Sequence, residues 1–230
     1  MKIKFEKYES GGNDFVLIDN RNNLYDLDSD KIKKICNRNF GIGSDGLIIL
    51  KKSKIADFKM VYFNSDGQSS SLCGNGTRCL FSFSLSLGIV KKIAKIETSE
   101  GIYIATNSNK DLVSLKMKDI DDILLFDNKA CLNSGSPHHV EMIEDLNKIS
   151  VKNMGSSIRF SRRYSPYGTN VNFFKKINDK KFEIRTYERG VEDETLSCGT
   201  GATAVAIAVH AMGLTTQSEI IIQTKGGELI

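Results

Sequence analysis

The feature that most constrains this chain is an internal repeat built around a cysteine. The segment Cys-Gly-Asn-Gly-Thr at 73–77 returns as Cys-Gly-Thr-Gly-Ala at 198–202, and each copy precedes an apolar stretch of helical length. Those stretches end at Gly88 and Gly213, so both the motif and its distal glycine are displaced by the same 125 positions. A repeat in register at two points predicts two related halves, each with a cysteine where a helix begins.

The flanking patterns repeat in the same order. Ser10–Val16 and Ser134–Val140 share Ser, Gly and Val at corresponding places, and we read the second of these segments, with His138, as a polar loop. Apolar alternation and helical spacing supply the remaining elements, and the repeat offset places the boundary between the halves near residue 112. The predicted strands are 15–19, 47–50, 59–63, 93–98, 102–106, 112–117, 171–175, 182–187 and 220–223, and the predicted helices are 30–39, 77–87 and 202–212.

The second repeated helix indicates what the motif does. Residues 202–210 are apolar on nearly every side, so the helix is expected to be buried and its N-terminus becomes an interior feature. Backbone N–H groups at such an end suit an anion and stabilise a thiolate. Two thiols of this kind facing one pocket could remove a proton from one side of a carbon and return one to the other. We therefore take a racemase or epimerase as the leading hypothesis.

The alternative is a purely structural role, in which each motif is only a helix-start turn with an inert, buried cysteine. For a single copy that alternative would be the better one, and the repeat is what reverses the preference. Glu188 and Arg189, just upstream of the second motif, form either an exposed ion pair or a reader of an amino acid's ammonium and carboxylate groups.

Two other motifs do not support a competing function. The run Gly-Ile-Gly-Ser-Asp-Gly at 41–46 matches a dinucleotide fingerprint, but a predicted helix precedes it and a strand follows, the reverse of what that fold needs. The spacing of the cysteines and histidines does not fit a zinc site, so we expect no metal.

Composition sets the class of protein. The chain has 230 residues, of which 40% are hydrophobic and 26% are charged, as in an ordinary soluble globular protein. A net charge of +4, with lysines in scattered groups, does not indicate a nucleic-acid surface. The N-terminus lacks the apolar core of a signal peptide, no run is long enough to span a membrane, and five cysteines are an odd number. We expect free thiols in a reducing cytoplasm.

Taken together, these motifs resemble the diaminopimelate epimerase family. The two cysteine motifs with their flanks are the most specific part of the match, and the matching segments follow family order along the whole chain. They are residues 12–16, 37–46, 63–67, 72–79, 137–138, 169–170, 187–190, 194–201 and 226–227.

The resemblance implies an α+β fold with two pseudo-symmetric domains, each a mostly antiparallel sheet curled around a central buried helix, with the active site in the cleft between them. The repeat offset gives domains at 1–112 and 113–221, and the resemblance implies that residues from about 222 to 230 can return to the first. It also implies interconversion of LL- and meso-2,6-diaminopimelate without pyridoxal phosphate or any other cofactor, in lysine and peptidoglycan precursor biosynthesis, by a homodimer.

Roles for individual residues follow from the resemblance by position. Cys73 is implied as the thiolate base and Cys198 as the thiol acid in the LL-to-meso direction, with roles reversed for the return. His138 and Glu188 are implied to tune the two thiols. The implied substrate-binding residues are Asn13, Asn64, Gly74, Asn75, Asn170, Glu188, Arg189, Gly199 and Thr200, with Ser136 where the family commonly has Asn.

Three alternatives remain open at this stage. A related cofactor-independent racemase would share the cysteine pair and act on another amino acid. A binding protein that kept the fold would have no need of two thiols. A dithiol redox protein is weakly supported, because the chain has no Cys-x-x-Cys motif.

Overall fold

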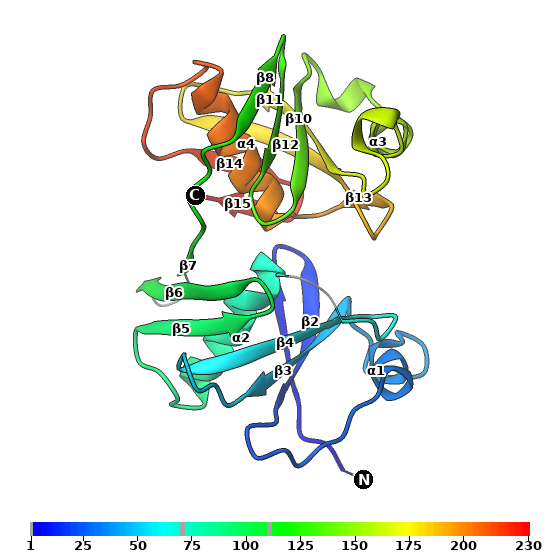
Figure 1. Cartoon of the computed structure of the whole chain (residues 1–230), viewed down its shortest axis with the longest axis vertical. Helices are drawn as coiled ribbons and strands as arrows, with labels where there is room; N and C mark the ends of the chain where they lie inside the picture. Colours follow the sequence, from blue (N-terminus) through cyan, green and yellow to red (C-terminus); the bar gives the residue numbers. More distant parts are fainter. Residues whose placement is uncertain (1, 70–71, 110–111) are drawn as a thin grey trace. The chain divides into compact units, whose positions relative to one another are not determined.

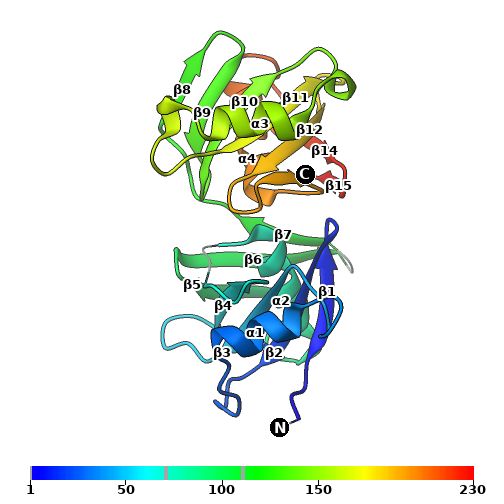
Figure 2. The same cartoon turned by 90° about the vertical axis from the view of Figure 1, so that its right-hand side faces the viewer.

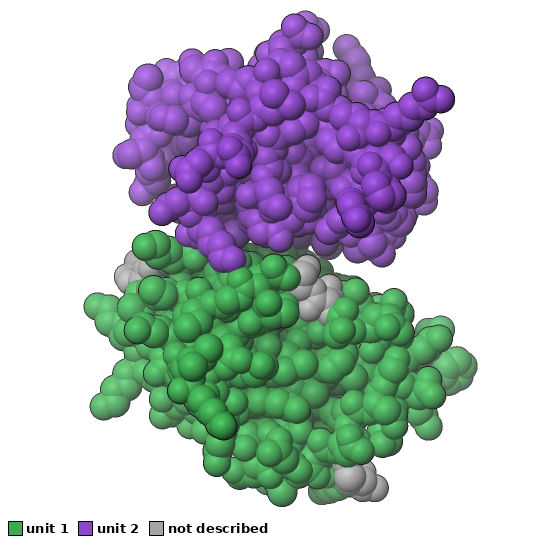
Figure 3. Space-filling model, viewed as in Figure 1, with its two compact units in different colours: residues 1–116 green, residues 117–230 purple. Residues whose placement is uncertain are grey.

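The chain folds into two compact units, residues 1–116 and 117–230, in a computed structural model that describes residues 2–69, 72–109 and 112–230 (Figures 1 and 3). The division falls a few residues after the position near 112 that the repeat predicts. None of the described helices is long and apolar enough to cross a membrane.

Unit 1 is a seven-stranded sheet in which the strand order in space follows the chain, β1-β2-β3-β4-β5-β6-β7. Most neighbouring pairs are antiparallel, and β2–β3 and β4–β5 are parallel. The elements are β1 (Glu6–Ser10), β2 (Asn13–Asp19), α1 (Ser29–Cys36), β3 (Gly46–Lys51), β4 (Phe58–Asn64), α2 (Gly74–Ser86), β5 (Ile93–Thr98), β6 (Gly101–Asn109) and β7 (Leu112–Lys116).

Strands β2 and β3 are apolar on both faces because a helix covers each face. Along β2, Phe15 and Leu17 pack with α2, whereas Val16 and Ile18 pack with α1. The period of two residues in a strand sends successive side chains to opposite sides, so the unbroken run Phe-Val-Leu-Ile serves two cores at once. The curled sheet encloses α2, and α1 lies on its outer face (Figures 1 and 2).

Unit 2 repeats this arrangement in the order β15-β14-β12-β11-β10-β9-β8, with β13 paired to β12. Its elements are β8 (Ile123–Phe126), β9 (Lys129–Asn133), β10 (Pro137–Met142), η1 (Leu146–Lys148), α3 (Val151–Arg159), η2 (Arg162–Tyr164), β11 (Asn170–Lys176), β12 (Lys181–Glu188), β13 (Asp193–Thr195), α4 (Gly199–Ala211), β14 (Ile221–Thr224) and β15 (Gly227–Leu229).

Unit 2 also has an apolar core on each face of its sheet. Phe174 and Phe182 pack around α4, which the sheet encloses, while Val171 and Phe173 pack with α3 on the other face. Close approach of α3 to the sheet requires Gly155, because a Cβ there would lie 2.4 Å from the Cβ of Tyr187.

The pairing pattern confirms the predicted pseudo-symmetry. From β9 to β15 the sequence of antiparallel and parallel neighbours is the one found from β1 to β6. Even the register agrees, since Phe58 pairs with Ile96 in unit 1 and Phe182 pairs with Ile222 in unit 2. The α+β class, with mostly antiparallel sheets curled around a buried helix, is thus confirmed.

The end of the chain departs from one expectation. The resemblance allowed residues 222–230 to join the first half, but β14 pairs with β12 and β15 pairs with β14, both in unit 2. The reason is Ile222, whose side chain is buried among the residues around α4. The terminal hairpin therefore fills the place in unit 2 that β5 and β6 fill in unit 1.

Candidate functional site

In unit 1 the topology gathers the predicted residues at one end of the sheet. Asn13 is the first residue of β2, Asn64 is the last residue of β4, and Gly74 is the first residue of α2. Gly46, at the start of β3, pairs with Asn64 on one side and with Phe15 on the other. Residues far apart in the sequence are thereby brought close to the N-terminus of the enclosed helix.

Cys73 is the N-cap of α2, and its Sγ contacts Gly76 and Asn13 within its unit. The backbone N–H of Gly76 donates to its Sγ at 3.4 Å, a contact that favours the thiolate. The Sγ also lies 3.8 Å from Oδ1 of Asn13, where the thiol can donate. Asn13 and Cys73, both predicted from the sequence, therefore meet in the structure.

A charged network that the sequence reasoning did not assign holds Asn13 in place. Asn13 Nδ2 donates to Asp45 at 2.8 Å, and because a carboxylate can only accept, the amide oxygen of Asn13 must face Cys73. Arg38 bridges Asp45 and Asp14, and Lys7 also pairs with Asp14. Burial alone would raise the pKa of Asp14, but its bonds with Arg38 and Lys7 hold that pKa well below its usual range.

The first turn of α2 is packed tightly. The side chain of Asn75 is buried and accepts from the guanidinium of Arg78. Gly76 has no room for a side chain, since a Cβ would lie 2.7 Å from Cδ1 of Ile48. Gly74 and Asn75 lie where a helix offers its N–H groups no acceptor of its own, so this turn is suited to an anion.

Unit 2 gathers its predicted residues at the corresponding end of its sheet. Asn170 begins β11, Glu188 ends β12, and Gly199 begins α4. His138 is not in a polar loop, as the sequence suggested, but is the second residue of β10 and pairs with Asn170. It is only 1% exposed, because its polar partners lie inside the unit and the imidazole needs no water.

The protonation of His138 follows from its neighbours. Asn172 Nδ2 donates to the His139 carbonyl at 3.1 Å and to His138 Nδ1 at 2.9 Å, while its oxygen accepts from Thr186. A carbonyl can only accept, which fixes the orientation of the Asn172 amide. Nδ1 of His138 is therefore the acceptor, and a neutral ring carries its proton on Nε2.

The proton on Nε2 of His138 begins a series of hydrogen bonds that leads to the second cysteine. His138 Nε2 lies 3.0 Å from Thr200 Oγ1, which lies 3.5 Å from Cys198 Sγ. With Nε2 donating, the Thr200 hydroxyl is directed to donate to the sulfur, and such a donor stabilises the thiolate of Cys198. Burial and the nearby charge of Arg189 lower the pKa of His138 to about 3, so the ring stays neutral at ordinary pH.

Three further predicted residues form one hydrogen-bonded group. Asn170 Nδ2 donates to Ser136 Oγ at 2.9 Å, and Asn170 Oδ1 accepts from the backbone N–H of Arg189 at 2.9 Å. The Arg189 guanidinium reaches the same Ser136 oxygen at 3.5 Å. Asn170 is 4% exposed and thus acts as the fixed centre of this group.

Glu188 lies beside this group, in more regular structure than the sequence suggested. No strand was predicted between residue 187 and the second cysteine motif, but Asp193–Thr195 forms β13, in which Asp193 pairs with Glu188. Arg185 and Glu194 clamp β12 to β13 with two bonds of 2.7 Å. Arg38, Asp45, Asn172 and Thr186 are among the site residues that the sequence reasoning missed, since only their contacts in the fold reveal them.

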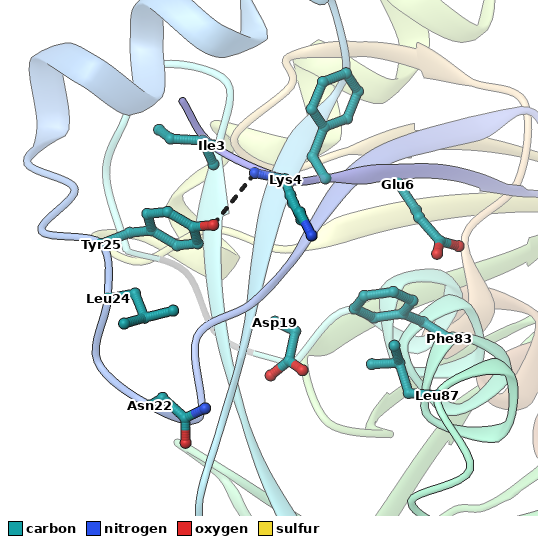
Figure 4. A pocket seen from close by; sticks show the side chains of 10 residues that line it. Ile3, Lys4, Glu6, Asp19, Asn22, Leu24, Tyr25, Phe83 and Leu87 are labelled. Atoms are coloured by element: carbon teal, nitrogen blue, oxygen red, sulfur yellow. Dashed lines mark hydrogen bonds between the residues drawn. The ribbon is translucent and has the colours of Figure 1, made fainter. Parts of the chain in front are cut away.

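A pocket of about 560 Å³ lies elsewhere in unit 1, between the N-terminal segment and the C-terminal end of α2 (Figure 4). Tyr25, Phe83 and Leu87 are among its lining residues, and none of the predicted site residues lines it. Within the described ranges, no group of three or more His, Cys, Asp or Glu side chains could hold a metal ion.

Comparison with known proteins places these observations in a family. Residues 5–119 and 130–230 match the family model described as diaminopimelate epimerase. The chain is 48% identical over 228 residues to a diaminopimelate epimerase from Flavobacterium psychrophilum, covering 99% of this chain and 89% of that protein. It is 38% identical to one from Aquifex aeolicus, covering 99% and 88%, respectively.

Solved structures show the same fold at low sequence identity. A probable proline racemase from Agrobacterium radiobacter, with bound carbonate, matches with a TM-score of 0.71 at 16% identity over 99% of this chain and 83% of that one. A phenazine biosynthesis protein from Bacillus anthracis matches with a TM-score of 0.70 at 16% identity, over 99% and 89%, respectively.

Proposed function

The chain belongs to the diaminopimelate epimerase family, and from that membership we propose that it interconverts LL- and meso-2,6-diaminopimelate. It is an isomerase. The observation that carries the proposed mechanism is the repeated one: each unit presents a cysteine as the N-cap of its enclosed helix. The relatives described above are all diaminopimelate epimerases, so the alternative of a racemase for another amino acid is not favoured.

We propose that Cys73 and Cys198 act on opposite faces of one α-carbon. In the LL-to-meso direction the Cys73 thiolate removes the α-proton and the Cys198 thiol delivers a proton to the other face; the roles reverse for the return. An α-proton beside a carboxylate is a very weak acid, and a single base would have to reach both faces of the carbon. Two groups held in line avoid that difficulty.

The surrounding groups have complementary tasks in this proposal. The N–H groups of Gly74, Asn75, Gly199 and Thr200 hold the reacting carboxylate and stabilise the charge that develops on it. Asn13, Asn64, Asn170, Glu188 and Arg189, with Ser136, hold the remaining ammonium and carboxylate groups. His138 acts on Cys198 through Thr200, and Glu188 adjusts the acidity of a thiol.

Incubation of the freshly reduced protein with LL-diaminopimelate in D2O, without added cofactor, tests the proposal. Meso product carrying α-deuterium is expected by NMR, and its formation should fall by a factor of about 100 to 10,000 in Cys73→Ala and in Cys198→Ala. Full activity in either variant would contradict the two-thiol mechanism. No exchange in the unmodified protein would contradict the substrate.

We further propose that the protein works in the cytoplasm as a homodimer, supplying lysine and peptidoglycan precursors. Its five free cysteines support a reducing compartment. Sedimentation equilibrium measures the assembly state directly, and a mass near 25.6 kDa would contradict the dimer.

A further inference from the structure

Unit 2 contains a second thiol cluster, outside the residues assigned to the proposed reaction. Cys131 of β9 and His139 of β10 are direct cross-strand neighbours. Ala130 and Leu132 pack toward α4, so the alternation of the strand puts Cys131 on the opposite face of the sheet. With Tyr164 of η2 and Glu141 of β10, these residues form what we call the Cys131 cluster.

Short contacts connect the four side chains in one line. Tyr164 Oη lies 2.8 Å from Cys131 Sγ and 2.7 Å from His139 Nδ1. On the far side of the ring, His139 Nε2 lies 3.1 Å from Glu141 Oε2. The imidazole is 5% exposed and packs edge-on against Tyr164, which restricts its rotation.

The direction of each hydrogen bond can be deduced from the carboxylate end. Glu141 can only accept, so Nε2 of His139 donates to it, and Nδ1 of the neutral ring is then an acceptor. Cys131 Sγ lies 4.0 Å from Nδ1 and Tyr164 Oη only 2.7 Å, so the hydroxyl is the better placed donor to Nδ1, which leaves its oxygen to accept from the Cys131 thiol. The Cys131 thiol can then pass its proton to Tyr164 while Tyr164 passes its own proton to Nδ1 of His139. The result is a thiolate at Cys131 and an imidazolium at His139 that faces Glu141.

Charges around the cluster favour that state. Burial alone would raise the pKa of Cys131, but its bonds to His139 and Tyr164 and the nearby Arg163 lower it below the ordinary thiol value. Burial would lower the pKa of His139, and Cys131 and Glu141 raise it instead. The hydrogen bond with His139, and then Lys129 at 3.1 Å on the neighbouring strand, hold the pKa of Glu141 below its usual value.

Cys131 also differs from the other cysteines that lie outside the proposed site. Cys36 and Cys79 are buried, and burial raises the pKa of each thiol, that of Cys79 to about 12. Cys131 is partly exposed. A reactive cysteine needs both a stabilised thiolate and access for its reagent, and Cys131 has both.

We propose that Cys131 is a covalent-modification site that reacts with small hydroperoxides. The thiolate attacks one peroxide oxygen, so that an S–O bond forms and the O–O bond breaks. The sulfur loses two electrons and becomes a sulfenic acid, while the peroxide is reduced. The departing hydroxide, or alkoxide from an organic hydroperoxide, takes the proton that His139 returns through Tyr164 and leaves as water or an alcohol. A peroxide needs both a thiolate and a proton donor, and this cluster supplies both.

The test uses the full chain treated with hydrogen peroxide and dimedone, followed by mass spectrometry of each cysteine-containing peptide. A dimedone adduct is expected at Cys131, while Cys36 and Cys79 in the same sample stay unlabelled. The rate at Cys131 should fall roughly tenfold in Tyr164→Phe and in Glu141→Gln, as expected for a thiol pKa raised by about one unit. Glu219→Gln, the same change at a carboxylate outside the cluster, should leave the rate unaltered.

The proposal is overturned if the unmodified chain gives no adduct at Cys131, or if Tyr164→Phe and Glu141→Gln are labelled as fast as the unmodified chain. Should Tyr164→Phe fail to fold, Glu141→Gln still decides the question, because it leaves the buried ring contacts in place. Cys131→Ser is expected to abolish the adduct while deuterium exchange into diaminopimelate continues at its normal rate. The dimedone adduct is measured without diaminopimelate, so this readout does not depend on whether the proposed epimerase mechanism is right.

Discussion

Asn172 determines which nitrogen of His138 carries a proton. Its amide is held by the His139 carbonyl and by Thr186, so it can present only a donor to the imidazole. The tautomer of a histidine is commonly fixed by the partner of its other nitrogen, and here that choice is transmitted through Thr200 to Cys198. Asn172 therefore acts as a positioning residue, at a distance from the reacting atoms.

Replacement of Asn172 by Leu should raise the pKa of the Cys198 thiol, because the Thr200 hydroxyl is no longer directed toward the sulfur. We expect kcat to fall by about tenfold, the effect of one hydrogen bond, with little change in KM. The pH profile of Cys198 alkylation measures the pKa directly. Asn147→Leu, at an exposed position in η1, is the matched control, and an unshifted profile in Asn172→Leu would rule out the positioning role.

The buried His138 should make stability depend on pH. In the unfolded chain this residue has the ordinary histidine pKa of about 6.5, whereas in the folded chain its pKa is about 3. The free energy of unfolding should therefore fall as the pH decreases through this range, by up to about 1.4 kcal/mol per pH unit. Urea denaturation of His138→Gln, with exposed His210→Gln as control, should show this dependence reduced only in the first variant.

At the scale of elements, the two enclosed helices differ in how firmly their first turns are packed. A Cβ on Gly201 would lie 2.4 Å from Oδ1 of Asn172, an amide held by hydrogen bonds on every side. A Cβ on Gly76 would meet Cδ1 of Ile48, the tip of a flexible side chain. The same glycine in the repeat thus has a rigid neighbour in one unit and a yielding neighbour in the other.

Gly201→Ala should accordingly be more harmful than Gly76→Ala. We expect the first to lower the free energy of unfolding by roughly 1–3 kcal/mol through overpacking, and the second to cost less. Thermal or urea denaturation of the two variants provides the comparison. Equal losses would show that the Asn172 amide can move aside, which would weaken the case for a fixed tautomer at His138.

Helices and strands with a clear apolar pattern in their own sequence were predictable. Strands that are ordered mainly by pairing with neighbouring strands were not. Helices α2 and α4 and the apolar strands β2, β3, β11 and β12 were each expected close to their observed positions. β10 was missed because Pro137, His138 and His139 have the composition of a loop, and only pairing with β9 and β11 makes the segment a strand. The same applies to β13, whose three residues are ordered by β12.

For the candidate site, residue types were easier to predict than their partners. The contact between Cys73 and Asn13 and the group formed by Ser136, Asn170 and Arg189 join residues that the sequence had already marked. Asp45, in the bend before β3, and Asn172, in β11, were not marked, because nothing in their local sequence shows what they contact in the fold. Hydrogen-bond partners depend on register, and register is a tertiary property.

At the scale of the whole molecule, each unit is complete in strands, helices and cores. Ile96 of β5 and Ile222 of β14 occupy equivalent positions, each paired with a phenylalanine and each buried beside the enclosed helix of its own unit. The terminal hairpin is therefore a structural part of unit 2.

Ile222→Ala should destabilise unit 2 by about 2–5 kcal/mol, because it leaves a cavity beside α4. Hydrogen exchange should show faster exchange in β12 and α4, with protection in unit 1 unchanged. Ile96→Ala is the matched variant and should give the opposite pattern. Loss of protection in β2 or β3 on mutation of Ile222 would mean that the chain end supports unit 1 after all.

The internal duplication also bears on how such a protein can change over time. The groups described around Cys73 come from Asn13, Asp45 and Arg38 in one unit, and those around Cys198 come from Thr200, His138 and Asn172 in the other. A substitution in one set leaves the other set intact. A chain that carries two copies of one device can therefore change the surroundings of each thiol separately, so that a substitution beside one cysteine needs no compensating change beside the other.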